Sequence, residues 1–500
     1  MKKHINIIHL SINLSVLTAA ALLGLSAPAL AAFDSGSACA VPSDPNCLGA
    51  FSPTINTTVT LPPDGILNYT TFTVPAGVTV SFKKNATNTP VVIRTSGNVS
   101  IAGAISVSVQ TAPTPSGTAG DGVLGDDGQP GTGGPGGFDG GPGGLGPVLG
   151  GTSGASGGPG KGPGGGQSVA GLVYSGYGYS GGGAGFNGAG GNGYSSTSGG
   201  LSYGQSSLLP IIGGSGGAGG AAGSSFSGSG GGAGGGAILI ASSDTISVSG
   251  YIYADGGAGG ATTGTSSGGA GGSGSGGAIR LVANTLTRSG AGYLYARGAT
   301  GTGSDYGGGG AGANGYIRLE SNVITNWTTG YSTPAYSYVL PGKLFVPNNP
   351  TLTITGVAGQ SVPANPTGVG DVTLPQGTTT ATVQIAGTNI PRGTTVTIYV
   401  IPAVGANRSS ALSSALDGAS DAATTATATV TLANGNNVLL ASATYTVTEL
   451  VAMNMPKFGG EYVAKIRVES EMGGTTSKVT YITASGKEYP VDSKVVKAAS

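Results

Sequence analysis

The chain has 500 residues, of which 101 are glycine, and 20 basic and 20 acidic side chains give it a formal net charge of zero. Glycine is about three times as frequent as in average proteins, and charged residues are about a third as frequent. This is not the high-charge, low-hydropathy composition of a disordered chain. Because there is no basic stripe, we expect no nucleic-acid partner.

The first 31 residues have the features of a secretory signal peptide. Lys2 and Lys3 precede an apolar run that ends in Ala29, Leu30 and Ala31, a small-residue cleavage site. The alternative is a membrane anchor that is retained. We expect cleavage after residue 31, no membrane span after cleavage, and a secreted, extracellular or outer cell-surface location.

Histidine is confined to this leader, as His4 and His9. The mature chain therefore cannot form a Ser-His-Asp or Cys-His catalytic site, nor a zinc, copper or non-haem iron site that needs imidazole. Most hydrolase and oxidoreductase chemistries are excluded in this way. We predict that the protein is not an enzyme and has no catalytic residues.

Residues 32–110 are predicted to form an N-terminal cap and the first strands of a parallel β-solenoid. Short alternating runs such as TINTTVTL and VTVSFKK are separated by Pro- and Gly-containing turns. Cys39 and Cys47 lie just inside the mature N-terminus, and in an exported protein they are expected to form a disulfide. A metal or redox pair is the alternative, although the spacing is too wide for a CxxC motif.

Residues 111–236 are the glycine-rich region, and they lack the strict Gly-X-Y period of collagen. Such a tract can be a mobile linker. It can also pack as extended, left-handed segments with three residues per turn, in which only glycine lets neighbouring backbones approach closely. Scattered aromatic and apolar residues favour the packed arrangement. Within the tract Asp121, Asp126 and Asp127 are a candidate calcium site, with a solvated turn as the alternative; we otherwise expect no cofactor.

Residues 237–342 are predicted to contain the solenoid repeats and a closing segment. A phrase introduced by glycines recurs about every forty residues, as AILIA from Ala237, AIRLVA from Ala278 and YIRLES from Tyr316. The third copy is expected to stop after one strand pair. Apolar and polar residues alternate within each copy, which indicates strands with one buried face. Trp327 is expected to cover the last repeat, or alternatively to stack on carbohydrate.

Matching positions of the repeats carry the candidate site residues. Tyr251 and Tyr253 correspond to Tyr293 and Tyr295, and such aromatic pairs on adjacent strands either stabilise a solenoid or form an outward-facing surface for sugars or another fibre. Arg280 and Arg318 also match, as do Asp255 and Arg297, and we expect a charge ladder on the outer face. A polysaccharide-cleaving site would need paired carboxylates or calcium with a basic residue.

Two further regions follow the repeats. Residues 343–449 are predicted to form an Ig-like β-sandwich, because short alternating runs such as TATVQIAG and TTVTIYVIP are separated by turns. Residues 450–500 are richer in charge and are predicted to form a C-terminal β-hairpin or small sheet. The predicted fold class is therefore all-β: a parallel β-solenoid with polyglycine-type insertions, followed by a β-sandwich.

The order of a signal, a VVIRTSGNVSIAGAISVS segment, a long GG-rich tract, the GGAILIA and GGAIRLVA repeats and an Ig-like region resembles a known group of proteins. These are uncharacterised glycine-rich secreted proteins of Gram-negative bacteria, with some likeness to β-helical surface adhesins. The resemblance implies an architecture and carries over no functional residues. It favours a non-catalytic extracellular or cell-surface structural or adhesive protein, whose partners are an extracellular polymer, polysaccharide or sister chains. The alternative is a polysaccharide-binding or polysaccharide-degrading β-helix protein.

Overall fold

The structure is a computed structural model, and apart from two short 3₁₀ helices, η1 (Ala38–Ala40) and η3 (Thr329–Tyr331), its named elements are β-strands. The described residues are 31–86, 88–109, 111–113, 128–146, 155–168, 173–174, 177–194, 197–223, 226–261, 268–302, 308–345, 350–363, 370–403, 408–447, 455, 458, 461–472 and 477–492. The predicted signal peptide and Asp121, Asp126 and Asp127 lie outside them, except that the signal's last residue, Ala31, is described.

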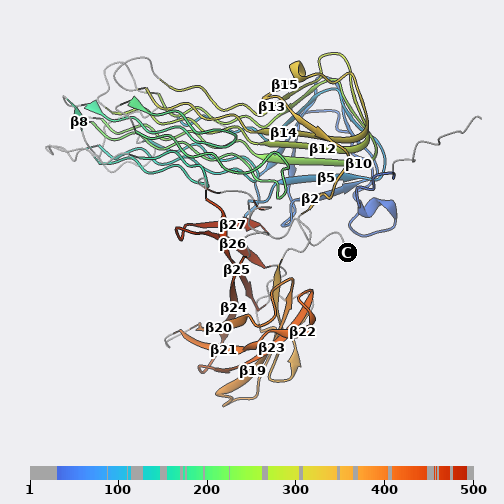
Figure 1. Ribbon diagram of the computed structural model, residues 1–500, viewed down its shortest axis with the longest axis vertical. Helices are drawn as coiled ribbons and strands as arrows, with labels where there is room; N and C mark the ends of the chain where they lie inside the picture. Colours follow the sequence, from blue (N-terminus) through green and yellow to red (C-terminus); the bar gives the residue numbers. More distant parts are fainter. Residues whose placement is uncertain are drawn as a thin grey trace, which may run out of the picture. The chain divides into compact units, whose positions relative to one another are not determined.

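Two parallel sheets contain the repeats (Figure 1). The first sheet has the order β16–β14–β12–β10–β5–β2, with β3 and β6 beside this path, and the second has the order β1–β4–β7–β11–β13–β15. The first sheet comprises β2 (Ile66–Tyr69), β3 (Phe72–Val74), β5 (Val91–Thr95), β6 (Val99–Ile101), β10 (Ala237–Val248), β12 (Ala278–Arg288), β14 (Tyr316–Thr325) and β16 (Ser337–Val339). The second comprises β1 (Thr57–Thr60), β4 (Thr79–Lys83), β7 (Ala104–Ser106), β11 (Tyr251–Tyr253), β13 (Tyr293–Tyr295) and β15 (Ser332–Thr333).

Each sequence repeat forms one layer, which we define as a strand of the first sheet followed by a strand of the second. Ile238 pairs with Ile279, which pairs with Ile317, so the three copies align in register. The VVIRTSGNVSIAGAISVS segment joins the same stack, because its first residue, Val91, is the partner of Ile238. The repeat-like strand arrangement expected from the sequence is thus present. The third copy, however, continues beyond one strand pair, because β15 and β16 extend both sheets.

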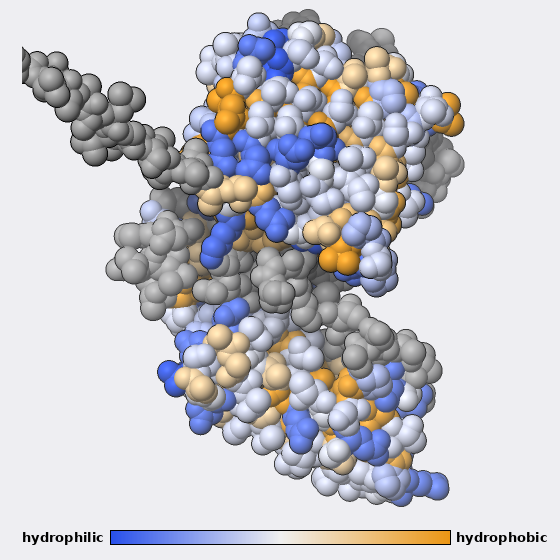
Figure 2. All heavy atoms as spheres, turned by 90° about the vertical axis from the view of Figure 1, so that its right-hand side faces the viewer, coloured by the Kyte–Doolittle hydropathy of each residue, from blue (hydrophilic) through white to orange (hydrophobic). Residues whose placement is uncertain are grey.

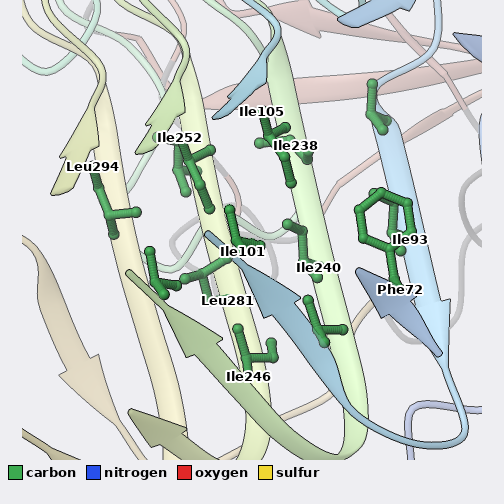
Figure 3. Close-up of a cluster of buried hydrophobic side chains, with 14 of the residues drawn as sticks. Phe72, Ile93, Ile101, Ile105, Ile238, Ile240, Ile246, Ile252, Leu281 and Leu294 are labelled. Atoms are coloured by element: carbon green, nitrogen blue, oxygen red, sulfur yellow. The ribbon is translucent and has the colours of Figure 1, made fainter. Parts of the chain in front are cut away.

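The main core lies between the two parallel sheets (Figure 3). Ile93, Ile240 and Leu281 from the first sheet are fully buried, and Ile252 and Leu294 from the second meet them. Matching residues stack from layer to layer because parallel strands in register place equivalent side chains side by side. Burying each such side chain stabilises the fold by about 1.5–3 kcal/mol.

The glycine-rich segments form an ordered bundle beside the layers, seen in Figure 1 as the long green lines that run on from the strands. Gly214, Gly217 and Gly220 donate backbone hydrogen bonds of 2.8, 2.8 and 2.9 Å to residues 235, 232 and 229. Residues 229, 232 and 235 donate in turn to residues 269, 272 and 275. Bonding at every third residue is the period of a polyproline-II helix. The described part of the tract therefore has the packed arrangement.

Close approach explains why this bundle needs glycine. A Cβ atom built on Gly217 would overlap the carbonyl oxygen of Gly272, and one built on Gly234 would overlap that of Gly214. The bundle is not confined to residues 111–236, since the segments between β11 and β12 and between β13 and β14 also belong to it. Each of the three glycine-rich connections, β7–β10, β11–β12 and β13–β14, leaves the second sheet and returns to the first.

The outer face of the first sheet is covered as well. Phe186, Tyr203, Leu208 and Ile211 of the glycine-rich region pack against Leu239 and its neighbours. An N-terminal strap, residues 33–38, crosses the strands through hydrogen bonds from Phe33 N–H to Asn284 Oδ1 (2.7 Å), Ser35 Oγ to Thr95 O (2.7 Å) and Ser37 Oγ to Tyr69 O (3.3 Å). Residues of this sheet are consequently buried on both faces, as in the uninterrupted buried run Ala237–Ser242 of β10.

The C-terminal region consists of two antiparallel sheets with a core of their own, which includes Leu352, Val383, Ile398 and Val468. The third sheet comprises β18 (Gln360–Ser361), β17 (Thr351–Val357), β19 (Thr380–Thr388), β23 (Ala423–Thr431) and β22 (Asp417–Ser420). The fourth comprises β21 (Ser409–Ala415), β20 (Thr395–Pro402), β24 (Asn437–Thr446), β25 (Val463–Glu471), β26 (Lys478–Thr483) and β27 (Glu488–Asp492).

Two expected boundaries differ from the structure. Strands β25, β26 and β27 are antiparallel neighbours, but they continue the fourth sheet through β24 instead of forming a separate hairpin or small sheet at residues 450–500. The layers were expected to end at residue 342. Phe345 is still buried with residues of the first sheet, so the chain leaves the layers later than expected. In both cases long-range pairing, which local composition does not reveal, sets the boundary.

Candidate functional site

The outer face of the second sheet carries the tyrosines singled out from the sequence. Along β11 and β13 the middle residues, Ile252 and Leu294, are fully buried in the core. The flanking residues point the other way and remain partly exposed: Tyr251, Tyr253, Tyr293 and Tyr295. We call these four side chains the tyrosine ladder. The period-two pattern of the strands thus assigns them to the outer face.

The ladder continues a row of hydroxyl-bearing residues across the whole second sheet. Its members occupy register-paired positions on all six strands: Thr58, Ser81, Ser106, Tyr253, Tyr295 and Thr333. Neighbouring strands lie about 4.8 Å apart, so the row repeats at that spacing. The Ser and Thr members were not predicted from the sequence, although the alternation in TTVT and TVSFK assigns Thr58 and Ser81 to this face.

The rings of the ladder are nearly parallel and close together. Centroids of Tyr293 and Tyr295 are 4.4 Å apart, and those of Tyr253 and Tyr295 are 5.3 Å apart with an interplanar angle of 4°. The guanidinium of Arg297 lies 4.2 Å from the centroid of Tyr295. Aromatic pairs of this kind each contribute about 0.5–1.5 kcal/mol beyond their buried area. The ladder is therefore a mutually packed array of rings.

The surroundings of two ladder tyrosines raise the pKa of their phenols. Partial burial raises the pKa of Tyr253, and the neighbouring Tyr295 and Tyr251 raise it further. Burial likewise raises the pKa of Tyr295, with Tyr293 adding to the effect and Arg297 opposing it. At neutral pH these hydroxyl groups can accordingly both donate and accept hydrogen bonds.

Asp255 and Arg297 form a paired group at one end of the ladder, as their matching places in the repeats suggested. Arg297 Nη2 lies 2.6 Å from Asp255 Oδ2, and the Arg297 backbone N–H donates to Asp255 Oδ1 at 2.8 Å. The hydrogen bonds that Arg297 donates to Asp255 raise the pKa of Arg297. Both oxygens of Asp255 are thus engaged by a guanidinium, an arrangement that suits positioning and not proton transfer.

The other matched pair, Arg280 and Arg318, is not an exposed charge ladder. Arg280 is fully buried, and its Nε donates to Glu320 Oε1 at 2.8 Å. Its Nη atoms donate to the carbonyl oxygens of Lys343 and Leu344, at 2.7 and 2.9 Å. The expectation failed because the outer face of the first sheet is covered, as described above. This group fixes the chain where it leaves the layers.

Burial by itself would raise the pKa of Glu320. Hydrogen bonds and charge from Arg280, together with a hydrogen bond from Arg318, instead hold that pKa below its usual range. The carboxylate is therefore ionised at neutral pH and committed to structure.

Trp327 has a structural position too. It is 9% exposed and belongs to the core between the parallel sheets, with Tyr336 edge-on at 6.1 Å. Its ring faces are therefore buried in the core and are not a platform for sugars. Large exposed apolar side chains are scattered over the described residues, and the face in Figure 2 shows them as small, separate patches among polar ones.

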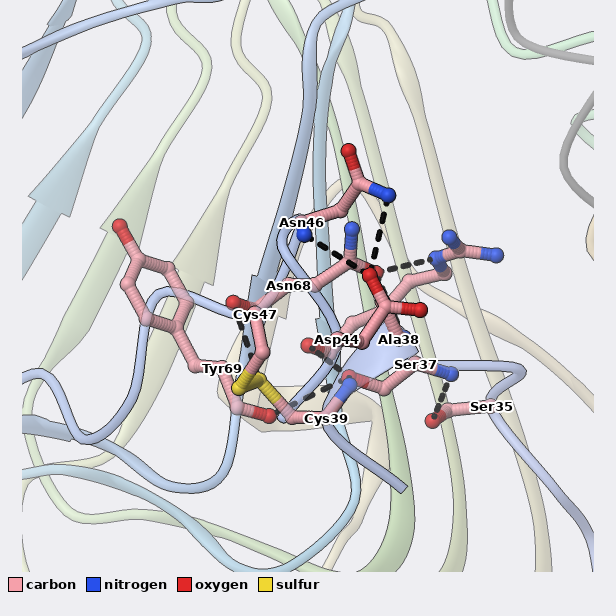
Figure 4. The surroundings of a disulfide bond; sticks show 10 residues. Ser35, Ser37, Ala38, Cys39, Asp44, Asn46, Cys47, Asn68 and Tyr69 are labelled. Carbon is pink, nitrogen blue, oxygen red and sulfur yellow. Dashed lines mark hydrogen bonds between the residues drawn. A yellow bond between two sulfur atoms is a disulfide. The ribbon is translucent and has the colours of Figure 1, made fainter. Parts of the chain in front are cut away.

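Cys39 and Cys47 are joined by a disulfide in the structure, the pairing expected from the sequence (Figure 4). Cys39 is buried, and Cys47 bridges to Asn68 at the start of the first sheet. Ser37 Oγ accepts a hydrogen bond from the Cys39 N–H at 3.2 Å. The disulfide loop thus lies where the N-terminal strap ends, and it fastens the strap to the first layer.

No group of three or more His, Cys, Asp or Glu side chains suited to a metal ion occurs among the described residues. Asp139 is paired with Lys84 and Lys161 at 3.1 and 3.5 Å. In the same described part of the chain, no helix is long and apolar enough to span a bilayer.

Comparison of the chain with protein-family models, curated proteins and solved structures finds no match. A functional assignment therefore depends on the residues of the chain itself.

Proposed function

We propose that this is a non-catalytic extracellular or cell-surface protein with a structural or adhesive role, which holds a partner polymer on the outer face of its second sheet. In this proposal the layers are a parallel β-solenoid, stiffened by the glycine bundle. The two C-terminal antiparallel sheets form an Ig-like β-sandwich, and residues 1–31 direct export.

One observation carries the proposal: the outer face of the first parallel sheet is covered by other parts of the chain, whereas that of the second carries partly exposed side chains. The first sheet is covered on its outside by the glycine-rich region and the N-terminal strap. The second presents the partly exposed tyrosine ladder and its row of hydroxyls. A regular, half-apolar surface of this kind is typical of a contact site.

The polysaccharide-binding half of the alternative is supported by the same ladder. The polysaccharide-degrading half has less support, because the carboxylate beside the ladder, Asp255, is bound by Arg297 through both oxygens. Glycosidic cleavage requires a carboxyl group that is free to exchange a proton.

The proposal is tested by cosedimentation of the purified protein with insoluble polysaccharides and cell-wall material. We expect Tyr253→Ala with Tyr295→Ala to reduce the bound fraction at least tenfold, since two packed aromatic side chains are lost. Tyr194→Ala is the matched control, because Tyr194 is 40% exposed but lies outside the ladder. Equal binding of all three proteins would contradict the proposal. Release of reducing ends that Asp255→Asn abolishes would contradict the non-catalytic assignment.

A further inference from the structure

The ring faces of the tyrosine ladder are largely used within the protein. The rings of Tyr293 and Tyr295 stack at 4.4 Å, Tyr251 and Tyr253 stack at 5.7 Å, and Arg297 lies over Tyr295. A sugar that stacks on an aromatic side chain needs an open ring face. The ladder is better suited to contact through the outer ends of its side chains, which carry the phenol hydroxyls.

The hydroxyl groups on this face of the second sheet differ in whether they already have a hydrogen-bond partner within the protein. At the two ends of the row, Thr58 bonds to Ser81 at 2.9 Å and Tyr293 bonds to Thr333 at 3.3 Å. The hydroxyls of Tyr251, Tyr253 and Tyr295 make no hydrogen bond to any residue that the structure describes. Each can donate one hydrogen bond and accept others. The centre of the row, at Tyr253 and Tyr295, and the neighbouring Tyr251 therefore have unused hydrogen-bonding capacity on the outer face.

The charge beside these hydroxyls is balanced. Arg297 and Asp255 neutralise each other at 2.6 Å, and the remaining register-paired members of the row are Ser and Thr residues without charge. The exposed Lys83 is a further charge on this outer face, two residues beyond Ser81. Around Tyr253 and Tyr295, where Asp255 and Arg297 cancel, a charged polymer would gain little, while an uncharged polymer with many hydroxyl groups would match both donors and acceptors.

We propose that the tyrosine ladder binds a neutral polysaccharide by hydrogen bonds to the hydroxyls of Tyr251, Tyr253 and Tyr295, with the sugar chain crossing the strands along the row from Ser106 to Tyr295. The direction follows from register, because Ser106, Tyr253 and Tyr295 are neighbours on successive strands. This inference rests on the proposed function and specifies the ligand class and the mode of contact.

The test separates the hydroxyls from the rings. The double variant Tyr253→Phe with Tyr295→Phe keeps the stacked rings but removes two hydroxyls. By isothermal titration calorimetry against neutral and acidic oligosaccharides, we expect wild type to bind a neutral oligosaccharide and the double variant to bind it at least about tenfold more weakly. The variant Thr58→Ala with Ser81→Ala removes hydroxyls that satisfy each other, and its affinity should stay within about twofold of wild type.

The outcomes distinguish the two proposals. If the phenylalanine variant binds like wild type while Tyr253→Ala with Tyr295→Ala does not, the hydroxyl contact is wrong and the polymer-binding function stands. Preference of wild type for acidic oligosaccharides would overturn the neutral ligand. If wild type binds no polysaccharide at all, the proposed function fails as well. Self-association in ultracentrifugation that the phenylalanine variant loses would assign the surface to a second copy of the chain.

Discussion

Arg280 has a position that is unusual for a charged residue, because its side chain is fully buried. The cost of removing a guanidinium from water is offset by the Glu320 carboxylate and two backbone carbonyls. Glu320 in turn accepts a hydrogen bond from the Gly342 N–H at 2.8 Å. The two side chains together hold residues 342–344 against the first sheet.

Replacing Arg280 should therefore destabilise the layers strongly. Arg280→Met leaves two carbonyls and part of a carboxylate without donors, and breaking a buried pair in this way costs about 3–5 kcal/mol. We expect the low end of this range, since Arg318 still donates to Glu320. The free energy of unfolding can be measured in urea from the fluorescence of Trp327, the only tryptophan, which lies in the core between the parallel sheets.

Lys161→Ala is the control for this measurement. Lys161 pairs with Asp139 at the surface, with 63% of its side chain exposed, and such pairs contribute at most about 1 kcal/mol. If Arg280→Met were no more destabilising than Lys161→Ala, the buried group would not anchor the chain.

At the scale of elements, the glycine segments replace side-chain packing by backbone packing. Segment 229–235 lies between segments 214–220 and 269–275 and is hydrogen-bonded to both. Ordering glycine costs more backbone entropy than ordering any other residue. Dense hydrogen bonding between buried backbones compensates for this cost, and it is possible only if no side chain intervenes.

A single methyl group should reveal this dependence. Gly217→Ala places a Cβ against the Gly272 carbonyl, and overpacking typically costs about 1–3 kcal/mol. We expect faster hydrogen exchange of the amides in segments 214–220, 229–235 and 269–275, measured by mass spectrometry. Gly188→Ala is the matched control in the same region, because nothing lies within 4 Å of its added Cβ. Equal exchange in both variants would mean that the segments are not closely packed.

The elements differ in how far the sequence predicts them. Alternation around Ile246 and Val248 identifies strands, and the matching Tyr251 and Tyr293 identify neighbours, because both signals are local or repeated. The burial of Arg280 depends on residues far away in the chain, such as Phe186 and Tyr203, which pack over the same sheet. The three-residue hydrogen-bond period is likewise hidden, since glycine occupies bonded and unbonded positions alike. The candidate site was found in part, its tyrosines by repetition and its Ser and Thr members only by register.

At the scale of the whole molecule, the layers and the C-terminal sheets each contain a buried tyrosine. Burial raises the pKa of Tyr69 in the layers to about 12, and that of Tyr481 in the C-terminal core to about 12. A phenol with a raised pKa in the folded state stabilises the fold fully below its unfolded pKa of 10.0. This contribution is lost as the pH rises from about 10 to 12.

We therefore expect the urea midpoint reported by Trp327 fluorescence to fall between pH 10 and 12. Tyr69→Phe removes the ionisable group from the layers and should make this fall smaller. Tyr481→Phe should leave the Trp327 transition unchanged, because its side chain belongs to the other core. An equal effect of both substitutions on Trp327 would contradict separate cores.

The glycine-rich connections run from the ends of β7, β11 and β13 to the starts of β10, β12 and β14. Their contacts recur at every third residue, so one inserted or deleted residue would rotate the rest of an arm by about a third of a turn and misdirect its amides. Inserting or deleting three residues, one full turn, would keep the amides in the same orientation and only lengthen or shorten the paired stretch by one hydrogen-bonding repeat. The glycine-rich connections can thus become longer or shorter by three residues at a time while the strands that they connect keep their register.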